Sequence, residues 1–178
     1  MKRIFIDGKD GTTGLKIYQR FENRDDIELL LIDPEKRKDT KERAKMINES
    51  DITFLCLPDA ASIEAVSLVE NDKVKIIDTS TAHRTLPEWA YGFAELSNEF
   101  RHKIETSNRI AVPGCYASGF NSIVYPLVHN NFIYISRTYH FTIYKIRLYR
   151  FQIQYSSTPL YNFINDSYFV KIPVLKHL

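Results

Sequence analysis

Apolar runs alternate with more polar, helix-like stretches over the first two-thirds of the chain. Each run is nearly continuous in Ile, Leu, Val and Phe, which is typical of strands buried on both faces. The expected strands are residues 3–7, 27–32, 51–57, 74–78 and 109–112, and the expected helices are residues 13–21, 40–50 and 59–69. Asp59 is the expected N-cap of the last of these helices. Buried strands that alternate with helices predict an α/β fold built on a doubly wound parallel sheet.

The pattern changes after Gly119. The remaining 59 residues contain no Gly, Ala or Glu, but they contain eight Tyr and six Phe. Residues 116–128 are expected to form a helix with Ile123 and Leu127 facing a core, and residues 139–155 alternate loosely, as strands do. No turn residues separate such strands. The break in composition therefore predicts an aberrant C-terminal segment beyond about residue 135.

The overall composition is that of a globular protein, with 44% hydrophobic and 26% charged residues. No uncharged apolar run reaches about 18 residues, and the first apolar stretch is too short for a signal peptide, so we expect no membrane span. Two distant cysteines do not make a disulfide framework, and a reducing cytoplasm is the expected location. Residues 120–178 carry six basic side chains and one acid. Nucleic-acid binding is an alternative for this segment, but no recognition signature accompanies the charge.

Three glycines follow the first expected strand in the stretch FIDGKDGTTGL. Gly8, Gly11 and Gly14 have the spacing GxxGxxG, at a turn into a helix that begins near Thr12. Residues without a Cβ allow backbone N–H groups to approach a pyrophosphate, and the helix N-terminus adds a favourable dipole. A Walker loop is excluded because Leu-Lys, and not Lys with Ser or Thr, follows the last glycine. The spacing indicates a Rossmann-like dinucleotide site, with a simple turn as the alternative.

Charged residues follow the second expected strand. Asp33 stands nineteen residues after Gly14, where an acid usually bonds the ribose hydroxyls of the adenosine. Lys36, Arg37 and Lys38 come shortly after it and could instead neutralise the 2′-phosphate of NADP. A solvated charged loop is the alternative for each of these residues. The residues themselves leave NAD and NADP both open.

The two cysteines differ in their surroundings. Cys56 lies inside the apolar run 51–57 and is expected to be a core residue. Cys115 follows Pro113 and Gly114 and opens a helix, where unpaired N–H groups and the dipole favour a thiolate. The same N–H groups could hold an oxyanion formed on a carbonyl that the thiolate attacks. Together with a dinucleotide loop, this setting favours a nucleophile over an inert cysteine at a bend.

These motifs give the chain a resemblance to the shorter sequence type of N-acetyl-gamma-glutamyl-phosphate reductase, within the wider semialdehyde dehydrogenase group. The stretches that carry it, in the family's order, are GKDGTTG, PEKRKD, FLCLPDAAS, DTSTAHR, YGFAELS and AVPGCYASGF, and the match runs to about residue 133. The resemblance implies reduction of N-acetyl-glutamyl phosphate to its semialdehyde in arginine biosynthesis, through a cysteine thioester. It also implies NADP(H) as the cofactor that supplies hydride.

The resemblance further implies roles for single residues. Cys115 is the nucleophile, and His177 in the terminal stretch LKHL is the candidate for the family's general base. His83 is assigned to the scaffold of DTSTAHR. The implied cofactor-binding residues are Gly8, Gly11, Thr12, Thr13, Gly14, Lys36, Arg37, Lys38 and Pro58, and the implied substrate-binding residues are Ser80 and Arg84.

The implied organisation is a dinucleotide-binding domain over residues 1–114, followed at 115–178 by the start of a catalytic domain that is degenerate or truncated after about residue 135. The Gly-rich stretch of the family's catalytic domain has no counterpart after Gly119. Expected partners are an acyl phosphate, inorganic phosphate and further copies in a homo-oligomer, without nucleic acid, membrane or metal. Two alternatives stay open: a non-catalytic dinucleotide-binding remnant, and an aspartate-semialdehyde dehydrogenase-like enzyme, against which DTSTAHR and YGFAEL argue.

Overall fold

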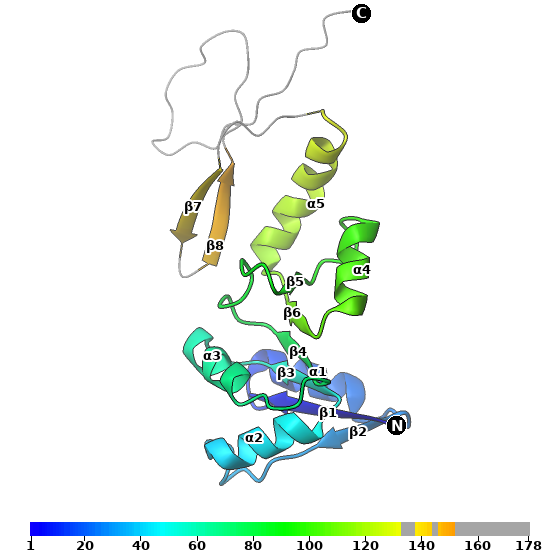
Figure 1. Cartoon of the computed structure of the whole chain (residues 1–178), viewed down its shortest axis with the longest axis vertical. Helices are drawn as coiled ribbons and strands as arrows, with labels where there is room; N and C mark the ends of the chain where they lie inside the picture. The colour runs from blue at the N-terminus through cyan, green and yellow to red at the C-terminus, as the bar shows by residue number, and fades with distance from the viewer. Residues whose placement is uncertain (133–137, 144–145, 152–178) are drawn as a thin grey trace, which may run out of the picture. The chain divides into compact units, whose positions relative to one another are not determined.

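The computed structural model describes residues 1–132, 138–143 and 146–151 (Figure 1). The chain divides into two compact units, Met1–Pro113 and Gly114–Leu178. The first unit contains the sheet and the helices that flank it. The described part of the second unit contains one long helix and a hairpin.

The first unit is built on a six-stranded sheet in which every neighbouring pair of strands is parallel. Its order is β2-β1-β3-β4-β6-β5. The strands are β1 Lys2–Asp7, β2 Ile27–Leu30, β3 Ile52–Leu55, β4 Lys75–Asp78, β5 Ala90–Tyr91 and β6 Arg109–Ala111. The predicted doubly wound parallel sheet is therefore confirmed.

The core lies on both faces of this sheet. Register places Phe5 beside Thr53 on one face, where Phe5 belongs to a buried cluster that includes Leu55 and two helix residues, Ile47 and Ala65. Ile47 comes from α2 (Thr40–Glu49) and Ala65 from α3 (Asp59–Ser67). On the opposite face, the last residue of α1 (Thr12–Phe21) places its ring 5.8 Å from the ring of Phe54. Because side chains alternate along a strand, helices cover both faces, as a doubly wound sheet requires.

The start of α3 differs from the expectation. Pro58 is the N-cap, and Asp59 is the first helical residue. The carboxylate of Asp59 accepts hydrogen bonds from the backbone N–H and the hydroxyl of Thr81, at 2.9 and 2.6 Å. The prediction of Asp59 as an N-cap was thus wrong, because its side chain is committed to another loop.

The second unit opens with α5 (Cys115–His129) and continues into an antiparallel hairpin of β7 (Thr138–Ile143) and β8 (Ile146–Phe151). Val124 is the buried residue of α5, with Phe120 and Val128 packed against it. Ile123 and Leu127 are 67% and 38% exposed, so the expectation that they face a core was wrong. Residues four apart share a helix face, and the buried face here is the neighbouring one. Among the described helices, none is both long and apolar enough to cross a membrane.

Candidate functional site

The glycine loop lies at the topological switch point of the sheet, where the chain begins to add strands on the other side of β1. β1 pairs with β2 on one side and β3 on the other, and ligands bind such sheets beyond the carboxyl ends of the strands at this point. Gly8 has φ +84°, and a Cβ on it would lie 2.3 Å from the carbonyl oxygen of Cys56. A Cβ on Gly14 would lie 2.3 Å from the carbonyl oxygen of Gly8. Both positions therefore require glycine, and the loop is pressed against the end of β3.

The loop leads into the N-terminus of α1, whose first N–H groups have no side-chain cap and could bind an anion. Gly11 is the N-cap of α1 and makes no side-chain cap bond, and the first turn holds no acid. Thr12 and Thr13, the first two helical residues, are exposed, whereas Gly14 is buried. Uncapped N–H groups and the positive end of the dipole favour a phosphate group at this position. These features fit the pyrophosphate of a dinucleotide.

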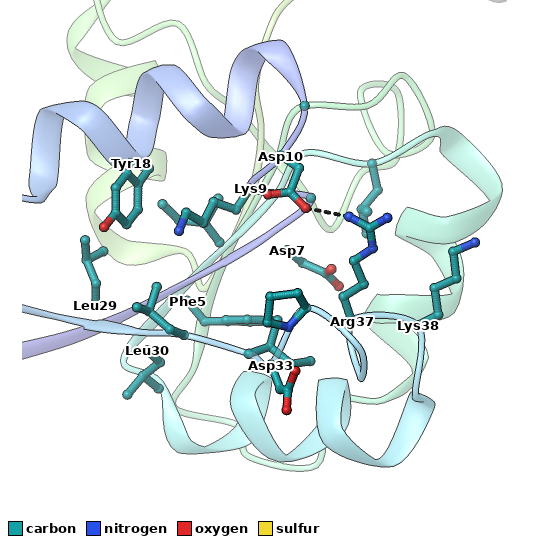
Figure 2. Close-up of a pocket in the computed structure, with 17 residues that line it drawn as sticks. Phe5, Asp7, Lys9, Asp10, Tyr18, Leu29, Leu30, Asp33, Arg37 and Lys38 are labelled. Atoms are coloured by element: carbon teal, nitrogen blue, oxygen red, sulfur yellow. Dashed lines mark hydrogen bonds and ion pairs between the residues drawn. The ribbon is translucent and has the colours of Figure 1, made fainter.

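A pocket of about 610 Å³ adjoins the glycine loop (Figure 2). Its apolar wall includes Tyr18 of α1 and Leu29 of β2, and the Nζ of Lys9 lies 3.9 Å from the centre of the Tyr18 ring. Three charged residues after β2 also line the pocket: Asp33, Arg37 and Lys38. The pocket has the size and the mixed apolar and charged lining of a site for a nucleotide.

The basic residues after β2 divide into two groups. Lys36 does not line the pocket and lies 3.7 Å from Glu42. Arg37 lines it and donates to the carboxylate of Asp10 at 2.7 Å. Lys38 lines it and, within the part of the chain that is described, has no carboxylate within ion-pair distance. Two of the three predicted basic residues thus reach the candidate nucleotide site.

A buried ion pair that the sequence did not reveal lies below the glycine loop. Asp7, the last residue of β1, is 6% exposed and accepts a hydrogen bond from Arg43 of α2 at 3.0 Å. A second guanidinium nitrogen of Arg43 donates to Glu64 of α3, also at 3.0 Å. Burial raises the pKa of the Asp7 carboxyl, and the Arg43 charge acts in the opposite direction. Arg43 therefore ties two helices to the residue that precedes Gly8.

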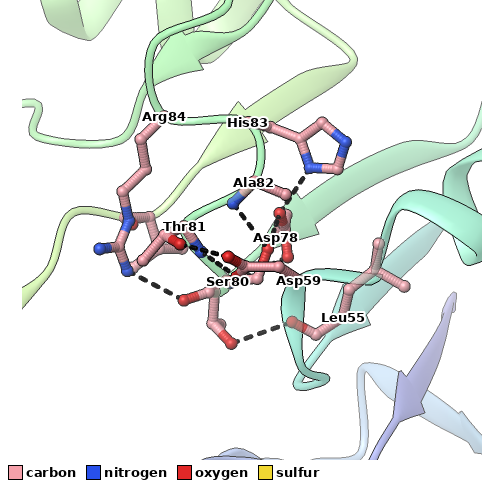
Figure 3. Close-up of polar contacts among 10 residues, drawn as sticks. Leu55, Asp59, Asp78, Ser80, Thr81, Ala82, His83 and Arg84 are labelled. Atoms are coloured by element: carbon pink, nitrogen blue, oxygen red, sulfur yellow. Dashed lines mark hydrogen bonds and ion pairs between the residues drawn. The ribbon is translucent and has the colours of Figure 1, made fainter. Parts of the chain in front are cut away.

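The stretch DTSTAHR forms a hydrogen-bonded loop at the carboxyl end of β4 (Figure 3). Asp78 is fully buried and accepts from the backbone N–H and hydroxyl of Ser80, at 2.9 and 2.6 Å. The Nδ1 of His83 lies 2.6 Å from the same carboxylate, and its ring stacks on Trp89 at 4.1 Å. These contacts agree with a scaffold role for His83.

The side chains of the two predicted substrate residues are both hydrogen-bonded to other groups of the protein. The hydroxyl of Ser80 donates to Asp78. Arg84 donates from Nε to the carbonyl oxygen of Val112 at 2.8 Å and from Nη2 to that of Thr79 at 3.0 Å. Their side chains therefore shape the ends of β4 and β6, and substrate binding by either residue stays a prediction.

The cysteines are as different in the structure as in the sequence. Cys56 is partly buried, and burial raises the pKa of its thiol to about 11. Cys115 is exposed and is the first residue of α5, whose N-cap, Gly114, makes no side-chain bond. His177 lies outside the described residues. The described residues hold no group of three or more His, Cys, Asp or Glu that could bind a metal ion.

An all-parallel doubly wound sheet with a closed glycine loop at its switch point defines a dinucleotide-binding domain. Residues 3–106 match the family model described as "Semialdehyde dehydrogenase, NAD binding domain", and the chain belongs to this family.

Three relatives, each named as N-acetyl-gamma-glutamyl-phosphate reductase, extend the match beyond the cysteine motif. The protein of Trichormus variabilis is 55% identical over 126 residues, which are 71% of this chain and 39% of the relative. That of Mesorhizobium japonicum is 50% identical, over 71% of this chain and 41% of its own. The reductase 2 of Pseudomonas putida is 46% identical, over 70% of this chain and 40% of its own. The chain thus spans about two-fifths of the length of these relatives.

Solved structures of aspartate semialdehyde dehydrogenases share the fold. The enzyme from Francisella tularensis has a TM-score of 0.58 at 14% identity, covering 80% of this chain and 45% of that one. Enzyme II from Vibrio cholerae has a TM-score of 0.52 at 18% identity, covering 78% and 49%. At such identities the likeness concerns the fold alone.

Proposed function

We propose that the chain binds NADP(H) at the glycine loop and supplies Cys115 as the nucleophile of an N-acetyl-gamma-glutamyl-phosphate reductase. One observation carries the proposal. The chain combines a loop in which Gly8 and Gly14 leave no room for a Cβ with an exposed cysteine at the start of a helix that has no side-chain cap. Its relatives named as this reductase are 46–55% identical to it. Because the match covers about two-fifths of each relative, the activity of the whole enzyme is part of the proposal.

The proposed cofactor contacts divide between backbone and side chains. The N–H groups of Thr12, Thr13 and Gly14 at the start of α1 would hold the pyrophosphate. Arg37 and Lys38, which line the pocket, would pair with the 2′-phosphate of NADP. Lys36, held near Glu42, adds only long-range charge. Pro58 contributes as the residue that turns the chain from β3 into α3.

The proposed role of Cys115 follows from its place in α5. Cys115 is exposed as the first residue of α5, so its sulfur is accessible for attack on the carbonyl carbon of an acyl phosphate. The new C–S bond forms as the C–O bond to phosphate breaks, so phosphate leaves with the electron pair and a thioester remains. When bound, NADPH would supply the hydride that reduces this thioester to the semialdehyde, with the Cys115 thiolate as the leaving group.

The test separates nucleotide binding from the cysteine chemistry. First, NADPH and NADH are titrated against the purified chain by calorimetry. Second, the chain is mixed with N-acetyl-glutamyl phosphate, and the acyl group on Cys115 is measured by intact mass, with Cys115→Ser as the control. We expect NADPH binding in both proteins and acylation only in the wild type.

Other results identify the alternatives. Nucleotide binding without acylation would favour a non-catalytic dinucleotide-binding module. Acylation by aspartyl phosphate in preference to N-acetyl-glutamyl phosphate would favour an aspartate-semialdehyde dehydrogenase. Phosphate-dependent oxidation of N-acetylglutamate semialdehyde with NADP⁺, lost in Cys115→Ser, would extend the proposal to the full reaction. The homo-oligomer implied by the resemblance stays a prediction that sedimentation of the purified chain tests.

A further inference from the structure

Two loops at the mouth of the pocket are joined by one ion pair. Asp10 belongs to the glycine loop after β1, and Arg37 to the loop after β2. The Nη1 of Arg37 lies 2.7 Å from the Oδ2 of Asp10, as the dashed line in Figure 2 marks. Both side chains are more than half exposed, at 54% for Arg37 and 70% for Asp10. The pair therefore bridges the loops in solvent, and it is not needed to fill the core.

The charges that line the pocket nearly cancel. The acids are Asp7, Asp10 and Asp33, and the bases are Lys9, Arg37 and Lys38. Asp7 is buried and already paired with Arg43, which approaches it from α2. Two acids thus remain against three bases, and the one base that an acid holds directly is Arg37. The charge that Arg37 offers to a ligand depends on Asp10.

We propose that Asp10 is a specificity-determining residue that acts through Arg37: its carboxylate competes with an adenosine 2′-phosphate for the guanidinium and reduces the preference for phosphorylated over unphosphorylated nucleotides. The proposal rests on the proposed function, since it concerns the same nucleotide site. Guanidinium groups bind phosphate best through two parallel N–H bonds. With Nη1 committed to Asp10, a phosphate meets an ion pair where it would otherwise meet a free cation. Asp10 is thus a positioning residue that weakens the binding of the 2′-phosphorylated nucleotide and leaves that of the unphosphorylated one unchanged.

The experiment compares two nucleotides that differ only in the 2′-phosphate. Dissociation constants for adenosine 2′,5′-bisphosphate and for 5′-AMP are measured by calorimetry with the full chain, for the wild type and Asp10→Asn. We expect Asp10→Asn to bind the bisphosphate roughly two- to five-fold more tightly, the effect of losing an exposed ion pair of ordinary strength. Binding of 5′-AMP should not change. A role of Asp10 in folding alone would alter both ligands alike.

Two further variants test the route of the effect. Asp26 is 65% exposed, pairs with Arg24 and does not line the pocket, so Asp26→Asn is a matched control and should leave both constants unchanged. In an Arg37→Gln background, the gain from Asp10→Asn should disappear, because there is no longer a guanidinium for which Asp10 and the 2′-phosphate compete. A gain of the same size in that background would show direct repulsion between Asp10 and the phosphate and would overturn the proposal.

Three other outcomes also overturn it: weaker binding of the bisphosphate by Asp10→Asn, no change in its binding, or an equal gain for 5′-AMP. They leave the proposed function standing as long as the wild type binds NADPH and Cys115 accepts the acyl group. A wild-type chain that binds neither NADPH nor the bisphosphate would overturn both proposals together.

Discussion

Replacing Gly14 by alanine tests the packing of the glycine loop directly. In a helix interior this change normally favours the helix by about 1 kcal/mol. Here the new Cβ would lie 2.3 Å from the carbonyl oxygen of Gly8 and 2.8 Å from the Cα of Lys9. Both neighbours are backbone atoms, so neither can rotate away as a side chain end would. We therefore expect the usual gain to turn into a loss.

The size of that loss follows from two contributions. Forcing an extra carbon into a packed site typically costs roughly 1–3 kcal/mol. The Gly8 carbonyl that must move also accepts the N–H of Gly11 at 3.0 Å, and losing such a hydrogen bond costs about 1 kcal/mol. After the gain in helix propensity is deducted, Gly14→Ala should lower the free energy of unfolding by about 1–3 kcal/mol.

The chain contains a convenient probe and a matched control. Its single tryptophan, Trp89, is buried in the first unit, so its fluorescence in a urea titration reports the unfolding of that unit. Gly119 lies inside α5, and a Cβ there would meet no atom within 4 Å among the described residues. The same substitution at Gly119, in the second unit, should therefore leave the midpoint reported by Trp89 unchanged. A Gly14→Ala midpoint equal to or above that of the wild type would refute the packing argument.

Iodoacetamide near neutral pH should alkylate exposed Cys115 much faster than Cys56, whose pKa is raised to about 11 by burial, and equal rates in a mass-spectrometric time course would contradict this order. Between pH 9.0 and about 11 the folded chain keeps the Cys56 proton that the unfolded chain has lost, so the free energy of unfolding should fall as pH rises. Cys56→Ala should flatten that fall relative to the wild type in paired urea titrations. Arg43→Met should cost roughly 3–5 kcal/mol because it leaves the buried Asp7 carboxylate unpaired, and adding Asp7→Asn should recover part of the loss. A loss no larger than that of an exposed ion pair would mean that water reaches Asp7.

The sequence predicted the sheet because burial on both faces leaves a strong local signal. Five continuous apolar runs became β1, β2, β3, β4 and β6, each shortened by one or more residues except at the amino-terminal strand. The elements that were missed lack this signal. β5 (Ala90–Tyr91) is two residues long, and α4 (Asn98–Thr106) has no buried residue, so neither has an apolar run or a buried stripe that a pattern search could find.

The site divides in the same way into local and long-range features. The glycine positions were predictable, because Gly8, Gly11 and Gly14 lie close together in sequence, and this spacing is typical of a loop whose backbone packs closely at the end of a strand. The pairs of Asp7 with Arg43 and of Asp10 with Arg37 join residues 36 and 27 positions apart. Charged residues are frequent in surface helices and loops, and nothing in a single sequence distinguishes an ion-paired arginine from a solvated one.

Four long-range contacts at the carboxyl ends of the strands follow the order of the strands in the sheet. Arg37 and Asp10 join the loops after β2 and β1, and the fit of Gly8 against Cys56 joins those after β1 and β3. Asp59, which opens α3 after β3, bonds to Thr81 in the loop after β4, and Arg84 reaches from that loop to Val112 after β6. Each loop thus contacts the next one in the order β2-β1-β3-β4-β6. Because parallel strands bring their carboxyl ends to one edge, neighbouring loops can brace one another there, and motifs far apart in sequence form one continuous rim. A substitution that loosens one contact should therefore affect nucleotide binding through its neighbours as well as through its own side chain.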